Sequence, residues 1–314
     1  MDNKNELMKR AAVVFPITML CCLLWGSAFP CIKIGYEALS VAADDSFTQL
    51  LFAGIRFFLA GILTIIIGSA GKRKLMLPDA GAMPKIMLLS LFQTILQYTF
   101  FYIGLARTTG MKSSIITASN VFLAIIISVF VFRQEKLTLR KTIGCILGFT
   151  GVVIVNLTSG ADMGFRLSGE GLIFLSATSY SVSSSLTKRY SCTYDPVMLS
   201  GWQFIFGGAV MTAAGSIMGG HLDTVTAKGI IMLIYLAFVS AIAFSLWGVL
   251  LKYNPVSKIA VFGFMNPVFG AILSALLLSE SGTPEPWRVV VSLILIAAGI
   301  ITVNLQTKGQ GSRE

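Results

Sequence analysis

The side chains best suited to bind a small molecule are four amides that lie inside apolar segments. Gln93, Gln97, Asn120 and Asn266 each stand within a long run of hydrophobic residues. An amide has several hydrogen-bonding atoms to satisfy, and polar groups in apolar surroundings usually face a helix bundle or a cavity. We therefore predict that these amides line a binding cavity, with close helix packing as the alternative for each of them.

Three aromatic residues lie in similar surroundings. Trp25, Tyr180 and Trp247 are predicted to form walls of the same cavity. The alternative is a place in an interfacial belt, where tryptophan and tyrosine gather at the surface of a bilayer.

Arg56 is the only charged residue near the middle of an apolar run. A charge at that depth is costly. It either anchors an anionic group of a substrate or is a structural arginine, satisfied by helix carbonyls or reaching toward an edge.

The sequence contains none of the residue patterns that are typical of catalysis or metal binding. The five cysteines form no CxxC pair or spaced Cys/His set, and the single histidine, His221, lies in a short loop, so no metal site and no cofactor are predicted. No P-loop is present. No carboxylate or histidine lies in mid-membrane, so nothing indicates a dedicated proton relay.

The composition indicates that most of this chain is embedded in a lipid bilayer. It has 314 residues, of which 55% are hydrophobic and 12% charged, whereas soluble domains are about 25% charged. The net charge of +10 is spread over short loops and forms no groove-sized patch, which excludes nucleic acid as a partner.

Ten apolar runs are long enough to cross a bilayer as helices, and none alternates like a barrel strand. The first run is too long for a signal peptide and is expected to stay as a helix. Pro30 and Pro267 lie inside runs and predict kinks, whereas Pro16 is expected in a first turn. The runs span residues 11–32, 47–70, 84–106, 113–132, 142–158, 169–187, 196–219, 229–251, 259–279 and 289–305.

The basic residues predict the orientation. Most of the 24 lysines and arginines fall in segments that share one side if the first helix starts in the cytoplasm. The positive-inside rule then places both termini in the cytoplasm of a multi-pass protein of the plasma membrane.

The second half of the sequence resembles the first. The segment 151–157 (GVVIVNL) matches 299–305 (GIITVNL), and 51–57 (LFAGIRF) parallels 198–204 (MLSGWQF). Because each half contains five helices, the second must enter the membrane from the opposite side. The predicted fold is an all-α membrane protein of ten helices, with inverted repeats at 11–158 and 169–306.

These features resemble the EamA repeats of the drug/metabolite transporter superfamily, over roughly residues 13–306. The resemblance rests on the segment 25–33 (WGSAFPCIK), on Arg56-Phe57, on Asn266-Pro267 leading to Glu280, and on the paired glycine-to-Val-Asn-Leu endings. It implies a ten-helix bundle with a central cavity. Phe122 stands where the family usually has a second mid-helix proline, so the halves are expected to bend unequally.

The resemblance also bears on two charged features. Because Arg-Phe at this place is a common feature of the family, a structural role is favoured for Arg56. Glu135 and Glu280 end equivalent helices, and we interpret them as salt-bridge or capping residues first and as gating residues second.

The expected function is a secondary transporter that exports amino acids or similar small metabolites by alternating access. The alternatives are a membrane enzyme acting on lipid-like substrates and a non-transporting membrane sensor. The expected partners are a small metabolite and the lipid bilayer. A homodimer seam through Gly144 and Gly148 is an alternative to close packing of these glycines within the bundle.

Overall fold

A computed structural model describes residues 6–42, 44–105, 107–108, 110–156, 166–278 and 285–305. Every regular element in these ranges is helical. The elements are α2 (Ala11–Ala38), α3 (Ser46–Lys72), α4 (Met83–Ser90), η1 (Leu91–Leu96), α5 (Gln97–Leu105), α6 (Gly110–Ala118), α7 (Asn120–Ile126), η2 (Ile127–Val131), α8 (Leu139–Asn156), η3 (Leu167–Gly171), α9 (Leu172–Ser191), α10 (Pro196–Ile217), α11 (Ala227–Tyr253), α12 (Val256–Ala260), η4 (Val261–Phe264), α13 (Met265–Leu278) and α14 (Pro286–Asn304).

The predicted runs correspond to these helices, several of which extend a few residues further. The third run is divided into α4, η1 and α5, the fourth into α6, α7 and η2, and the ninth into α12, η4 and α13. Glu280 and the predicted repeat ends at 158 and 306 lie outside the described residues.

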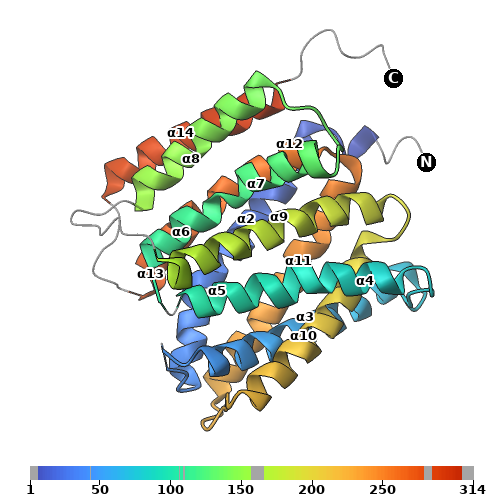
Figure 1. Ribbon diagram of the computed structural model, residues 1–314, viewed down its shortest axis with the longest axis vertical. Coiled ribbons are helices and arrows are strands. Elements are labelled where there is room, and N and C mark those ends of the chain that lie inside the picture. The colour runs from blue at the N-terminus through green and yellow to red at the C-terminus, as the bar shows by residue number, and fades with distance from the viewer. Residues whose placement is uncertain are drawn as a thin grey trace.

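Nine helices in the described part of the chain are long and apolar enough to cross a membrane, and α9 is not among them. Its sequence is rich in serine, yet it lies inside the bundle between α5, α7 and α11 (Figure 1). Several of its buried hydroxyls donate to main-chain carbonyls, as Ser181 does to Ala177 at 2.7 Å. Small hydroxyl side chains let neighbouring helices approach closely, which suits a helix in the interior of the bundle. Helix α9 therefore joins the nine more apolar helices as an interior member of the bundle.

The helices lie side by side, with α8 and α14 along one edge and α3 and α10 along the opposite edge (Figure 1). The start of α2 and the end of α14 lie at the same end of the bundle. An even number of crossings requires this arrangement.

The α3–α10 contact is the most extensive between any two helices, and glycines make it possible. A Cβ atom on Gly54 would lie 2.4 Å from the Thr212 nitrogen, and one on Gly208 would lie 2.3 Å from the Phe58 nitrogen. Both contacts are to the main chain, which cannot move aside as a flexible side chain can. The two helices therefore pack almost backbone to backbone, as small residues allow in membranes.

The glycines of the GxxxG pair in α8 also pack inside the bundle. A Cβ atom on Gly144 would lie 2.5 Å from Val303 Cγ2 of α14, and one on Gly148 would lie 2.3 Å from the Phe264 ring of η4. Neighbouring helices thus cover both residues, which leaves them no room to form a homodimer seam.

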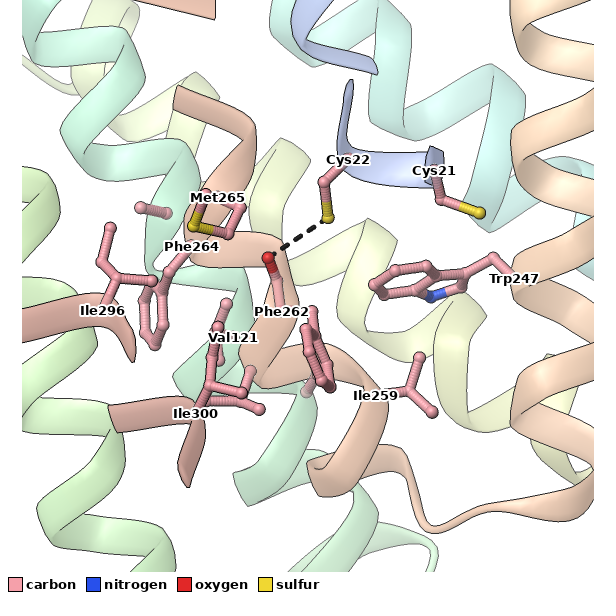
Figure 2. Packing of buried hydrophobic residues seen from close by; sticks show 14 of the residues in the cluster. Cys21, Cys22, Val121, Trp247, Ile259, Phe262, Phe264, Met265, Ile296 and Ile300 are labelled. Carbon is pink, nitrogen blue, oxygen red and sulfur yellow. Dashed lines mark hydrogen bonds between the residues drawn. The ribbon is translucent and has the colours of Figure 1, made fainter. Parts of the chain in front are cut away.

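Pro267 is preceded by a 3₁₀ turn, η4, which agrees with the predicted departure from regular α-helix. The Cys22 thiol of α2 donates to the Phe262 carbonyl of η4 at 3.2 Å (Figure 2). By contrast, α2 remains α-helical through Pro30. Pro16 lies in the second turn of α2 and not in the first, because that helix already begins at Ala11.

We expect Gly208→Ala to lower the stability of the protein by roughly 1–3 kcal/mol, because the methyl group would overlap the main chain of α3. The thermal midpoint of the purified protein in detergent measures this. Gly71→Ala in α3 is the control, since a Cβ atom there meets nothing within 4 Å. Equal midpoints for the two variants would contradict the close α3–α10 contact.

Candidate substrate site

A continuous row of aromatic rings crosses the interior of the bundle. The ring centres of Trp247 and Trp25 lie 5.0 Å apart, and so do those of Trp25 and Phe244 and those of Phe244 and Phe204. Phe204 stacks on Phe57 at 5.2 Å, and the ring centres of Phe57 and Tyr98 lie 4.3 Å apart. Edge-to-face and offset contacts of this kind are the favoured geometries of aromatic pairs. This aromatic row consists, in order, of Trp247, Trp25, Phe244, Phe204, Phe57 and Tyr98.

Two of the three aromatic residues predicted to form cavity walls belong to this row. Trp25 and Trp247 are in contact, Trp247 is buried, and Trp25 is half-buried. The indole nitrogen of Trp25 is buried without a hydrogen-bond partner among the described residues. Tyr180, on α9, packs with Trp25 against the same central cluster. All three therefore lie in the interior and not in an interfacial belt.

The four predicted amides lie on three different membrane segments. Gln93 is buried in the π-helical turn η1, and Gln97 begins α5 one turn later. Asn120 begins α7, and its carbonyl accepts a hydrogen bond of 2.9 Å from Ser181 of α9. The side-chain oxygens of Gln97 and Asn266 are buried and have no hydrogen-bond partner in the described part of the chain. Such atoms favour a polar ligand, because an unsatisfied buried acceptor is costly.

Arg56 does not have the environment expected of a structural arginine. Its side chain is 4% exposed, and neither Nε nor Nη1 has a hydrogen-bond partner among the described residues. The guanidinium carbon lies 4.3 Å from the ring centre of Phe57 and 5.8 Å from that of Tyr98. The main-chain carbonyls that were expected to satisfy these donors do not do so.

Sequence reasoning missed Phe57, Phe204 and Phe244 as interior residues. Phenylalanine in an apolar helix carries no signal of its own, because most such residues face lipid or a neighbouring helix. The repeat did contain a signal: Phe57 and Phe204 occupy equivalent places in the two halves, and they stack on each other.

One end of the bundle is tied together by Glu135, and we call it the Glu135 end. Its carboxylate accepts hydrogen bonds from Ser128 at 2.9 Å, from Lys141 at 2.5 Å, and from both the main-chain nitrogen and the hydroxyl of Ser257. The loop after η2 is thereby fixed to the start of α12. Helix α7 packs against α12 and η4 through apolar residues such as Val121 and Phe264 (Figure 2).

The opposite end is packed differently. There Glu170 forms an ion pair with Lys112 at 3.2 Å and accepts a hydrogen bond from Thr108 at 2.7 Å, which joins α6 to η3. Within the described residues, α6 makes no contact with α13 comparable to that between α7 and α12. Among the described residues, the fourth and ninth membrane segments thus pack together at the Glu135 end, and no comparable contact joins them at the other end.

Two ranges of the chain, 14–157 and 167–305, match the EamA-like transporter family. Together they cover nearly the whole sequence. The chain belongs to this family.

Curated relatives resemble the chain over almost its full length. "Uncharacterized transporter YvbV" of Bacillus subtilis (strain 168) is 27% identical, covering 92% of this chain and 90% of that protein. A Salmonella typhimurium protein named "Probable amino-acid metabolite efflux pump" is 26% identical, and the match covers 90% of this chain and 92% of that protein. One solved crystal structure shares the fold, with a TM-score of 0.75 at 17% identity and coverage of 94% of this chain and 97% of that chain.

The family and these relatives show that the chain is a multi-pass membrane transporter and not an enzyme. Of the predicted alternatives, the lipid-modifying enzyme and the non-transporting sensor are set aside. In the described part of the chain, no group of three His, Cys, Asp or Glu side chains is placed to hold a metal ion.

We expect Glu135→Gln to destabilise the protein by about 3 kcal/mol at neutral pH, because it removes the charged partner of Lys141 at a mostly buried site. Burial alone would raise the pKa of Glu135, but hydrogen bonds from Lys141 and Ser257 outweigh it and hold that pKa below its ordinary value. The stabilisation is therefore present above the unfolded-state pKa of about 4.3 and is lost as the pH falls through the lower folded-state pKa.

Chemical denaturation of both proteins at several pH values measures this difference. The gap between wild type and Glu135→Gln should be largest near pH 7 and should close in acid. Glu6→Gln is the control, since Glu6 and Lys9 form an exposed pair that contributes little. A gap that stays constant down to pH 3 would show that the charge of Glu135 is not what stabilises this end.

Proposed function

We propose that this transporter exports amino acids or similar small metabolites across the plasma membrane as a secondary transporter with alternating access. The amino-acid assignment is supported by the printed name of the Salmonella relative and by the mixture of amides and aromatic rings in the interior. Amides suit the polar part of such a molecule, and the aromatic row suits its apolar part.

The observation that carries alternating access is the difference between the two ends of the bundle. The Glu135 end is held together by an ion pair, hydrogen bonds and apolar packing, whereas no comparable contact between α6 and α13 is found among the described residues at the other end. Inverted repeats can exchange such an arrangement between their halves, which would close one end as the other opens. We propose that the halves 11–158 and 169–306 move in this way, with Trp25, Gln93, Gln97, Asn120, Tyr180, Trp247 and Asn266 lining the site between them.

The Glu135 end contains the start of α2, since Asn254 and Lys258 donate to the carbonyls of Met8 and Lys9. Under the proposed orientation, with both termini in the cytoplasm, this end faces the cytoplasm. We propose that this arrangement is the outward-facing state, in which an exporter releases its substrate.

Transport of labelled amino acids into proteoliposomes, without ATP and with only a substrate gradient, tests the function. Uptake should exceed that of empty liposomes for at least one amino acid, because the sequence contains no nucleotide-binding loop. Asn266→Leu should reduce it, since an amide in the proposed site is lost. Asn304→Leu is the matched control, because in the described part of the chain the Asn304 amide donates to the carbonyl of Ile300 in its own helix. A strict need for ATP would contradict secondary transport.

Cysteine labelling in intact cells tests the site and its opening. With the five native cysteines replaced, Asn266→Cys should react with a membrane-impermeant thiol reagent added outside, and a transported amino acid should slow the reaction. Ile126→Cys, on an exposed apolar face of α7, should stay unlabelled because lipid covers it. If Asn266→Cys reacts only in inverted vesicles, the bundle opens toward the other side and the proposed orientation is wrong.

A further inference from the structure

Arg56 lies deep in the bundle and keeps hydrogen-bond donors that the described protein does not use. It is the eleventh residue of α3, roughly 15 Å along the helix axis from its start. Arg56 is 4% exposed, and its Nε and Nη1 donate to no described atom. A buried charge without a counter-ion is among the costliest features a protein can retain.

The surroundings of Arg56 supply no negative charge. None of the described carboxylates lies within ion-pair distance of its guanidinium, and the neighbouring polar groups that interact with it are the neutral hydroxyls of Tyr36 and Tyr98. The Phe57 ring covers one side of the guanidinium at 4.3 Å. Stacking on an aromatic ring holds a guanidinium in place, and the Nε and Nη1 donors of Arg56 remain available to a planar anion.

The fold itself does not require an arginine at this place. In the second repeat the equivalent residue is Gln203, which is fully buried and accepts a 2.6 Å hydrogen bond from Thr94. A neutral amide thus fills the corresponding position beside Phe204, just as Arg56 lies beside Phe57. The charge at Arg56 is a feature of one half only, which points to a ligand and not to the packing of α3 on α10.

We propose that Arg56 binds the carboxylate of a small organic acid in the interior of the bundle. Arg56 is the only lysine or arginine that is buried in the described part of the chain, so the site matches one negative charge and not the two of a phosphate monoester. The apolar part of the acid lies along the aromatic row, which ends at Phe57 and Tyr98 beside the guanidinium. This inference rests on the proposed function and names the substrate class of the same site.

Equilibrium binding to the purified protein in detergent tests the proposal. The probes are acetate, isobutyrate and phenylacetate at pH 7, each paired with its neutral amide, together with inorganic phosphate. The fluorescence of Trp25 and Trp247, which belong to the aromatic row, reports binding and calorimetry confirms it. At least one acid should bind about tenfold or more tightly than its amide, the difference expected for hydrogen bonds to a charged group.

Arg56→Gln should abolish this preference for the acid, and Arg56→Lys should retain part of it. Arg140→Gln, which removes an exposed arginine from α8, should bind as the wild type does. If no acid outbinds its amide on the wild-type protein, or if Arg56→Gln binds acids normally, the proposal is overturned; tight phosphate binding with no binding of acids would overturn the carboxylate class. If Arg56→Gln does not fold, the comparison of each acid with its amide on the wild-type protein still tests the proposal.

The binding result does not depend on transport. Acids that bind through Arg56 without any compound being transported would contradict the proposed function and leave the anion site standing. Transport that Arg56→Gln leaves unchanged, for acids and amides alike, would overturn the anion site and leave the proposed function standing.

Discussion

Lipid offers no hydrogen bonds, and most of this structure follows from that constraint. Backbone polar groups are satisfied within helices, and polar side chains turn toward the interior. Because lipid also provides no hydrophobic force that would press helices together, they associate by close contact. The glycines of α3, α8 and α10 make that contact possible, since a methyl group at Gly54, Gly144 or Gly208 would overlap the neighbouring helix. Several buried polar groups have no hydrogen-bond partner among the described residues, and those of Trp25, Arg56, Gln97 and Asn266 are the candidates for ligand contacts considered above.

The sequence predicted the helices well and the interior less well. Long apolar runs report membrane helices directly, so the ten predicted segments lie close to the observed ones. The breaks at η1 and at Ser119 were not predicted, because no proline marks them. The environment of Arg56 was likewise out of reach, since a sequence shows that an arginine is deep in a helix but not which of its donors a carbonyl satisfies.

The two halves differ at places that matter for the interior. Arg56 corresponds to Gln203, and Phe122 corresponds to Pro267. Phe122 packs against Phe149 and Phe264, so the fourth segment carries an aromatic contact where the ninth carries a proline after a 3₁₀ turn. The proposed site is therefore asymmetric although both halves match the same family, and such a site suits a molecule with one charged and one apolar end. The repeat supplies the frame, and single substitutions within it supply the chemistry.

The serine-rich composition of α9 has a consequence for how the protein is made. During synthesis, each segment passes from the translocation channel into lipid according to its own hydrophobicity. Helix α9 is less apolar than the nine helices that could cross a membrane by composition alone, and its Ser179 and Ser181 hydroxyls donate to carbonyls of η1, of α7 and of α9 itself. The segments that hold it, α5 and α7, belong to the first half and leave the ribosome earlier. The first five helices thus act as an intramolecular receptor for the sixth, and a defect in the first half would appear as failed membrane insertion of the second.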